Sequence, residues 1–360
     1  MFRSFTVKNF RCFRDLTIGN LQRVNLIAGR NNTGKTALLE ALQIHSSPQD
    51  CELPFLVNQL RSPEALRKYS QEVAGWLFHD KQGDNGLELL SEDEEGHMRS
   101  LRCWLMDAAS ATARFPELQR WLESPFARLL WNSGRPWLIL RGESDGQATM
   151  AVAVPQETET GNGLGSLGNS PVTWYGPSRF LGSGPSSSEA DAAAFSELEA
   201  TNRQGEVVAN LTFLEPRLKR LSLLLVGGKP VIHGELCGVS RLVPVPFMGE
   251  GLRRLLSLLL AIAGASGGRV LVDEIENGLH YSVLKDVWKA VAQAARQAEV
   301  QVFATTHSWE CVRWAHEAFA EGPAYDLRLY RLDRTPEGVA AVTYDQEQIE
   351  SALFNAVEMR

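Results

Sequence analysis

One stretch of the chain places an apolar run, a glycine-rich turn and a helix-like run in immediate succession. Residues 24–28 read Val-Asn-Leu-Ile-Ala, residues 29–36 read Gly-Arg-Asn-Asn-Thr-Gly-Lys-Thr, and residues 37–42 read Ala-Leu-Leu-Glu-Ala-Leu. This order predicts a buried strand, a tight turn and the start of a helix. In such a setting the backbone N–H groups of the turn and the helix N-terminus bind phosphate oxygens. The sequence therefore predicts a P-loop nucleotide site.

The residue types in this turn each have a role in that interpretation. Gly29 and Gly34 allow the backbone to wrap closely round an anion. The ammonium group of Lys35 would reach the β- and γ-phosphates and support catalysis, and the Thr36 hydroxyl would bind Mg²⁺. The residues expected to bind ATP in this segment are Gly29, Asn31, Asn32, Thr33, Gly34, Lys35, Thr36 and Ala37.

Charge and cysteine usage argue against several classes of protein. The 360 residues hold 36 Lys and Arg against 43 Asp and Glu, a net charge of −7. Proteins that work mainly by gripping a nucleic-acid backbone are usually basic, so any DNA contact should be local or transient. The five cysteines form no Cys-X-X-Cys pair, which argues against a zinc site or a disulfide framework. Without a membrane-length apolar run or a signal-peptide-like start, we expect a cytoplasmic protein with no membrane partner.

The chain between the P-loop and residue 230 has a mixed pattern. Alternating apolar residues predict two antiparallel hairpins within residues 86–154. Residues 155–188 are rich in Gly, Ser and Pro and predict a loop with one strand at 172–175. Residues 189–225 predict helix with a break near Pro216, followed by a hairpin of residues 230–235 and 241–245. The expected segments are an N-terminal head part (1–50), an inserted α+β lobe (51–175), a loop and helical segment (176–230) and a C-terminal head part (231–360).

A second set of motifs follows in the last third of the chain. Residues 269–272 read Arg-Val-Leu-Val, a mostly apolar run that is followed by Asp273-Glu274, which is the pattern of a Walker B strand. Asp273 would hold hydrated Mg²⁺, and Glu274 would polarise the attacking water as general base. Glu276 is the next candidate for the base.

A histidine follows the next predicted strand. Residues 301–305 read Gln-Val-Phe-Ala-Thr, a run with an apolar centre, and His307 comes two residues after it. Ligands of parallel sheets bind at the carboxyl ends of the strands, so His307 should lie at the edge that carries the P-loop and Asp273. We expect its ring to contact the γ-phosphate or the catalytic water.

The order of these motifs resembles that of ABC-type ATPases, with a P-loop at 29–36, a signature at 249–251, Walker B at 273–274 and a switch histidine at 306–307. Residues 7–13 and 273–280 look like the branch that contains RecF, the structural-maintenance-of-chromosomes heads and the OLD (overcoming lysogenization defect) family. The similarity to stand-alone AAA15/AAA21-type bacterial ATPases extends over nearly the whole chain. It implies an α/β ABC-type ATPase head with a mostly parallel core sheet, an antiparallel subdomain and an inserted α+β segment.

The resemblance also implies an assembly. Heads of this type close in pairs on two ATP molecules, so we expect a homodimer, or a higher assembly built on it, whose signature binds the nucleotide of the opposite head. Related signatures usually contain a serine, whereas Met248 or Gly249 takes its place here, and Arg253 or Arg254 could add positive charge. The signature residues expected to bind ATP are Gly249, Glu250 and Gly251.

Two further positions follow from the resemblance. Arg11 lies at the bend before the P-loop strand, where related heads have a basic residue near the phosphates or adenine, so we expect it to contact nucleotide. The alternative is a surface arginine on a hairpin. The glutamine that commonly lies on the loop into the inserted lobe has three candidate positions, which are Gln43, Gln49 and Ser178-Arg179.

Two functions remain open. In the first, the ATP-closed dimer gates a separately encoded effector, such as a nuclease, as in bacterial anti-phage defence systems. OLD relatives carry a nuclease domain, and the roughly 50 residues after His307 are too few for one, so we expect any nuclease on another chain. In the second, a RecF-like repair or recombination ATPase clamps DNA. The net charge of −7 and the lack of a long arm favour the first.

Overall fold

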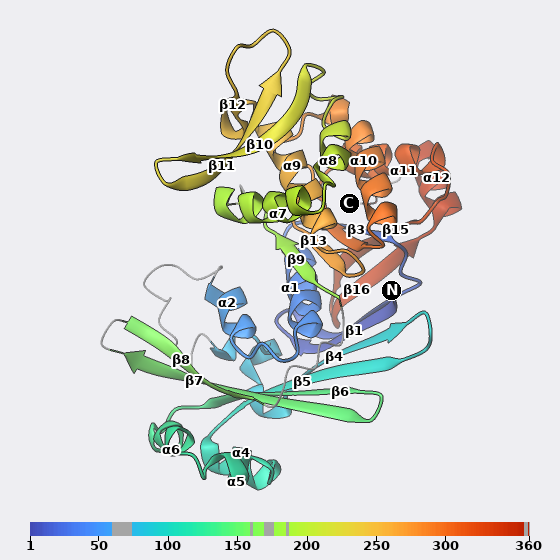
Figure 1. Cartoon of the computed structure of the whole chain (residues 1–360). Helices are drawn as coiled ribbons and strands as arrows, with labels where there is room; N and C mark the ends of the chain where they lie inside the picture. The colour runs from blue at the N-terminus through green and yellow to red at the C-terminus, as the bar shows by residue number, and fades with distance from the viewer. Residues whose placement is uncertain (60–73, 159–160, 169–175, 185–186, 356–358, 360) are drawn as a thin grey trace. The chain divides into compact units, whose positions relative to one another are not determined.

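The computed structural model describes residues 1–59, 74–158, 161–168, 176–184, 187–355 and 359 (Figure 1). The chain divides into two compact units, and each combines segments that are far apart in the sequence. The first unit comprises Met1–Asn20, Thr36–Tyr175 and Asp333–Ala341, and the second comprises Leu21–Lys35, Gly176–Leu332 and Val342–Arg360.

The first unit is built on an antiparallel sheet with the strand order β2-β1-β4-β5-β6-β7-β8. Its N-terminal strand β1 (Phe2–Phe10) pairs with β2 (Phe13–Gly19) on one side and with β4 (Leu87–Asp93) on the other. The expected antiparallel subdomain and both predicted hairpins are confirmed, and the inserted segment shares one sheet with the N-terminal strands. The remaining strands are β5 (Met98–Met106), β6 (Trp137–Ser144), β7 (Gln147–Thr158) and β8 (Gly161–Gly168).

Residues 155–188 contain more β-strand than predicted. The expectation of a loop there is wrong for β8, which pairs with β7 along its whole length and extends the sheet. Glycine-rich composition hides such a strand, because glycine contributes no side-chain alternation to the pattern. The strand predicted at 172–175 lies outside the described residues.

Apolar packing covers both faces of this sheet. On one face Trp104, Ile139 and Val152 lie side by side on neighbouring strands and pack with α4 (Ala108–Arg114) and α5 (Leu118–Trp121). On the opposite face the Phe5 ring stands edge-on to His45 of α1 (Lys35–Ser46), with 5.3 Å between the ring centroids. The shorter helices of this unit include α2 (Leu53–Gln59) and α6 (Pro125–Asn132).

The second unit contains a six-stranded sheet with the order β16-β15-β3-β14-β13-β9. The four pairings between β9 and β15 along that order are parallel, so the expected mostly parallel core sheet is confirmed. Every residue of β3, β13 and β14 is buried, as is usual for strands covered on both faces. The strands are β3 (Val24–Gly29), β9 (Ser178–Leu181), β13 (Arg269–Val272), β14 (Gln301–Thr305), β15 (Leu327–Thr335) and β16 (Gly338–Tyr344).

Helices follow the strands of this unit and complete its core. The most apolar of them, α9, is buried along much of its length. Among the described residues, no helix has the length and apolar character that crossing a membrane requires. The helices are α7 (Ser188–Ala200), α8 (Gln204–Ala209), α9 (Glu250–Ala263), α10 (Leu284–Gln297), α11 (Trp309–Ala320) and α12 (Gln346–Phe354).

The helix predicted at 189–225 is wrong in its last part. Strand β10 (Leu218–Val226) forms a hairpin with β11 (Lys229–Leu236), seen in yellow-green in Figure 1. Gly227 and Gly228 have φ of +59° and +82°, the conformation of a tight hairpin turn, and this turn pairs the two strands. The short strand β12 (Val243–Pro244) completes a three-stranded sheet.

Candidate functional site

The P-loop leaves β3 in a backbone conformation that requires glycine. Gly29 has φ of +146°, and a Cβ atom at this position would lie 2.7 Å from the carbonyl oxygen of Leu332. Asn32 and Gly34 also have positive φ, at +63° and +102°. Turns that alternate in this way point successive backbone N–H groups into a concave, anion-binding surface. Within the loop, Asn31 and Asn32 are exposed.

The Lys35 side chain bonds to the backbone of this loop. Its Nζ donates to the carbonyl oxygens of Gly29 at 2.7 Å and Arg30 at 3.0 Å, and its side chain is buried. Burial lowers the pKa of the Lys35 ammonium from its ordinary value, and the carboxylates that follow β13 act in the opposite direction. Thr33 is buried beside it and donates from Oγ1 to the carbonyl oxygen of Arg30 at 2.9 Å.

Acidic residues gather where β13 ends. Asp273 is buried, and its Oδ1 accepts a hydrogen bond from Thr305 Oγ1 at 2.6 Å. The backbone N–H of Glu274 donates to the same Thr305 hydroxyl oxygen at 2.8 Å. Glu274 has φ of +49°, which costs a non-glycine residue about 1–2 kcal/mol. Backbone strain that neighbouring bonds hold in place is typical of functional sites.

The Glu274 carboxylate is held from the following turn. Its Oε2 accepts a hydrogen bond from Asn277 Nδ2 at 2.7 Å, and its side chain is about one-third exposed. The same Asn277 amide also donates to the carbonyl oxygen of Ser183 at 3.2 Å. This carboxylate is therefore oriented, and it remains accessible to solvent.

His307 follows β14 and faces two of these carboxylates. Its Nδ1 lies 3.3 Å from Glu276 Oε1 and 3.7 Å from Glu274 Oε1. The ring is half exposed, whereas the Glu276 side chain is only 10% exposed. From the sequence, Glu276 was only the second candidate for the general base, and its position beside His307 was not predicted. The signal for it was the run Asp-Glu-Ile-Glu at 273–276, which places a third carboxylate just beyond the strand.

The predicted signature forms the exposed start of α9. Gly249 precedes the helix with φ of +103°, and both Gly249 and Glu250 are exposed. Gly251 packs closely on the turn after Walker B, because a Cβ atom there would lie 3.3 Å from the carbonyl oxygen of Gly278. Arg253 pairs with Glu250 at 3.1 Å. The helix start is thus in contact with the segment that holds Glu274.

Arg254 points into its own unit. It is buried, and it donates to the carbonyl oxygens of Gly182 at 2.8 Å and Asp273 at 2.9 Å. Burial lowers the pKa of this guanidinium, although nearby carboxylates counteract the effect. The sequence suggested that Arg253 or Arg254 adds positive charge at the signature. Arg254 instead bonds to backbone carbonyl groups of its own chain, whereas Arg253 lies nearer the surface.

Arg11 belongs to the first unit and is largely buried there. Its guanidinium forms an ion pair with Glu40 at 3.0 Å, with 12% and 6% of the two side chains exposed. The backbone at this bend has φ of +50°, its N–H donates to Leu77 O at 2.9 Å, and its carbonyl oxygen accepts from His79 Nδ1 at 2.9 Å. The alternative of a surface arginine is therefore wrong.

The second unit brings most of the predicted catalytic residues together. The carboxyl ends of β3, β14 and β13 are neighbours, and they carry Lys35, His307 and the Asp273-Glu274 pair respectively. Thr36, Ala37 and Arg11 fall in the first unit. No group of three His, Cys, Asp or Glu forms a metal cage in the described parts of the chain, and Mg²⁺ bound with phosphates needs only one or two carboxylates.

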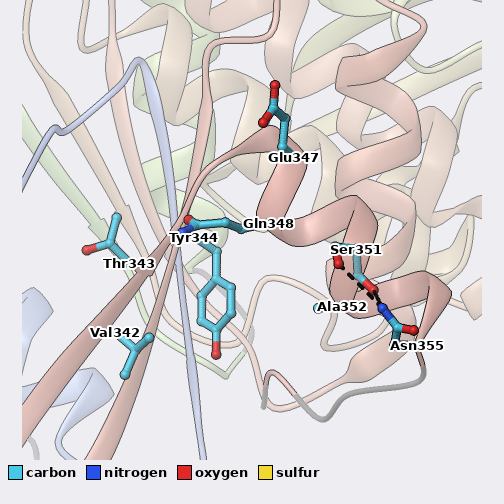
Figure 2. A pocket seen from close by; sticks show the side chains of 8 residues that line it. All are labelled: Val342, Thr343, Tyr344, Glu347, Gln348, Ser351, Ala352 and Asn355. Atoms are coloured by element: carbon cyan, nitrogen blue, oxygen red, sulfur yellow. Dashed lines mark hydrogen bonds between the residues drawn. The ribbon is translucent and has the colours of Figure 1, made fainter.

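A pocket of about 430 Å³ lies between β16 and α12 (Figure 2). Its lining contains one carboxylate and no basic residue, so it is poorly suited to a polyphosphate. None of its residues is a predicted site residue. The lining consists of Val342, Thr343, Tyr344, Glu347, Gln348, Ser351, Ala352 and Asn355.

Two family matches cover separate parts of the chain. Residues 1–95, which include the P-loop, match the family described as "AAA ATPase domain". Residues 177–312, which include the signature, Walker B and His307, match the family described as "AAA domain, putative AbiEii toxin, Type IV TA system". The two matches divide the predicted motifs between them in the order in which they occur.

One similar protein matches nearly the full length of this chain, and another matches a short segment of it. A protein of Helicobacter pylori named "ATP/GTP phosphatase" is 21% identical over 99% of this chain and 98% of its own length. An uncharacterised protein of Methanocaldococcus jannaschii is 42% identical over 50 residues, 14% of this chain and 23% of that protein.

Among solved structures, heads of structural-maintenance-of-chromosomes proteins are similar. One bound to the C-winged helix domain of ScpA has a TM-score of 0.49 at 12% identity, covering 96% of this chain and 98% of its own. The head from Thermotoga maritima has a TM-score of 0.43 at 13% identity, covering 96% and 99%. At these scores the similarity carries no statement about function.

Proposed function

Because the chain is an ABC-type P-loop ATPase of the RecF/SMC-like branch, we propose that it binds and hydrolyses Mg-ATP and closes as a homodimer around it. One observation carries the proposal. Lys35, Asp273, Glu274 and His307 meet at the carboxyl ends of three adjacent parallel strands, where nucleotides bind in sheets of this kind.

The residues fit a polyphosphate with a divalent cation. The P-loop N–H groups and the buried Lys35 ammonium would bind the β- and γ-phosphates. Asp273 would hold Mg²⁺, and the bound cation would neutralise phosphate charge. The signature residues 249–251 would bind the γ-phosphate of the second head.

Glu274 is the proposed general base. Its carboxylate would take a proton from the attacking water as the water oxygen bonds to the γ-phosphorus and the bond to the β–γ bridging oxygen breaks. The amide of Asn277 and the strained backbone at Glu274 orient this carboxylate before substrate binds. The products are ADP and inorganic phosphate.

The biological role that we propose is control of a separately encoded effector in anti-phage defence. The second family description refers to a putative toxin of a type IV toxin–antitoxin system, which supports a two-component arrangement. A RecF-like role on DNA remains the alternative. Stimulation of ATPase activity by duplex DNA that falls steeply with salt would favour that alternative.

Nucleotide-dependent thermal stability tests the ATP site. Mg-ATP should raise the thermal midpoint of the wild-type chain in proportion to the logarithm of ligand concentration, and Lys35→Ala should abolish the rise. Lys289→Ala is the control, since this lysine is exposed and pairs with Glu321. Phosphate release measured on the same samples tests hydrolysis. A full ATP-induced shift in Lys35→Ala would remove the P-loop assignment.

A further inference from the structure

We propose that Glu276 is a positioning residue that holds His307 by its backbone and by ring atom Nδ1, so that Nε2 is the ring nitrogen presented to nucleotide. The inference deepens the proposed ATPase function and rests on it. Neither the Walker B pattern nor the switch-histidine pattern assigns this carboxylate a role.

One oxygen atom makes the contacts. Glu276 Oε1 accepts from Thr306 Oγ1 at 2.7 Å and from the backbone N–H of His307 at 3.0 Å. The Nδ1 atom of the His307 ring lies 3.3 Å from the same oxygen. The carboxylate therefore fixes the end of β14, the direction of the backbone at residue 307 and the orientation of the ring.

Burial makes these contacts strong. Only 10% of the Glu276 side chain is exposed, and hydrogen bonds to a charged acceptor are stronger than those between neutral groups. Within the described residues, Glu276 Oε2 is buried and makes no hydrogen bond. Leaving a buried carboxylate oxygen without a partner is costly.

The chemistry of the contact selects the state of the ring. An ionised carboxylate can only accept hydrogen bonds, so Nδ1 must carry hydrogen when it bonds to Glu276. In the neutral ring Nε2 is then an acceptor, and in the cation it is a second donor. In both states Nε2 lies on the side of the ring away from Glu276.

Other charged groups lie near the His307 ring and the carboxylates beside it. Glu274 Oε1 lies 3.7 Å from Nδ1, and the Lys35 ammonium interacts with the carboxylates of Asp273, Glu274 and Glu276. Glu276 differs from the other two because its Oε1 accepts a hydrogen bond from the His307 backbone N–H and also lies nearest to the ring Nδ1, at 3.3 Å. We therefore assign it to His307 rather than to the attacking water.

A double-mutant cycle in the full-length chain tests the assignment. Glu276→Ala should lower kcat for ATP about 10- to 100-fold, the range that loss of one charge-assisted hydrogen bond gives, with KM changed less than about threefold. In a His307→Ala background, Glu276→Ala should lower kcat by less than about twofold. Additive losses would overturn the proposal.

The conservative variant separates positioning from base catalysis. Glu276→Gln retains an oxygen that can accept from Thr306 and His307, so its kcat should lie within about fivefold of wild type. If Glu276 were the general base, Gln would be as inactive as Ala, because an amide cannot take the proton. An inactive Glu276→Gln would therefore overturn the positioning role. This variant also provides a test if Glu276→Ala fails to fold.

Ring NMR supplies a readout that does not depend on activity. Long-range ¹H–¹⁵N correlation spectra of ¹⁵N-histidine-labelled protein should show His307 protonated at Nδ1 in wild type, with His307→Ala giving the assignment. Glu276→Ala should lose this preference and Glu276→Gln should keep it. A neutral wild-type ring protonated only at Nε2 would overturn the inference. An absence of ATP hydrolysis in wild type would instead contradict the proposed function and leave the NMR result standing.

Discussion

The guanidinium of Arg254 donates to the backbone carbonyl oxygen of Asp273 at 2.9 Å. The same guanidinium donates to Gly182 at 2.8 Å, so α9 is tied both to the end of β13 and to the segment after β9. Because α9 begins at the predicted signature, a shift of this helix would move the backbone that carries Asp273 and Glu274. The contact of Gly251 with Gly278 offers a second link between the same two segments.

Loss of Arg254 should therefore affect both stability and turnover. Arg254→Ala removes the hydrogen bonds to the buried carbonyl oxygen of Asp273 and to that of Gly182, and it should lower the free energy of unfolding by about 2–4 kcal/mol in chemical denaturation. Arg254→Lys keeps a charge but lacks the planar fork, so it should lose less stability. Arg253→Ala is the control and should change stability by no more than about 0.5 kcal/mol. Equal losses in the Arg253 and Arg254 variants would contradict the bracing role.

Glu274→Gln should separate ATP binding from hydrolysis. Glutamine keeps an oxygen for the Asn277 amide but cannot take a proton, so phosphate release should slow by about a hundredfold or more. The Mg-ATP-induced thermal shift should remain, and the ATP-bound assembly should accumulate in light scattering. Glu347→Gln, which changes an exposed carboxylate of α12, is the control. Wild-type turnover in Glu274→Gln would place the base elsewhere.

Arg11 offers a test that distinguishes structure from nucleotide contact. Its ion pair with Glu40 is largely buried, so Arg11→Ala and Glu40→Ala should each lower the free energy of unfolding by about 3 kcal/mol. If Arg11 also contacts nucleotide, only Arg11→Ala should weaken Mg-ATP binding in calorimetry. Equal ATP affinities of the two variants and the wild type would limit Arg11 to its structural role.

The predictable parts of this molecule are those whose signal is contiguous in the sequence. The runs at 24–29, 269–272 and 301–305 are mostly apolar because parallel strands covered on both faces are buried on both sides, and all three are strands of the core sheet. Gly29, Gly34 and Lys35 could be predicted as site residues because the P-loop requires a fixed spacing along the chain. Their position at the carboxyl ends of the strands then followed from general sheet architecture.

The parts that were missed depend on neighbours that are distant in sequence. Leu218–Val226 is apolar enough for helix or strand, and the positive-φ turn at Gly227-Gly228 decides for strand. The spacing of apolar residues in α9 predicts that this helix is buried, but it does not predict that Arg254 contacts the backbone of Asp273. The role of Glu276 required the knowledge that β13 and β14 are adjacent, because its partners lie about 30 residues further along.

The shared ATP site of the proposed dimer gives the last prediction. Gly249 is exposed at the start of α9, and a Gly249→Asp change should place a carboxylate against the γ-phosphate of the second head. Each head should still bind ATP, but hydrolysis should be lost because the dimer cannot close. Any residue other than glycine is strained at φ of +103°, so Gly249→Ala is the matched control that adds strain without charge.

Mixing two inactive variants then tests whether the site is shared. A dimer of one Gly249→Asp chain and one Lys35→Ala chain has one composite site with both defects and one site with neither. Random pairing in an equal mixture makes about half of the dimers mixed, so about a quarter of wild-type activity should return if the interface is isologous. The Gly249→Ala control should retain more activity than Gly249→Asp. No recovery in the mixture, together with no ATP-dependent increase in the mass of Glu274→Gln, would show that each head hydrolyses ATP without a partner's signature.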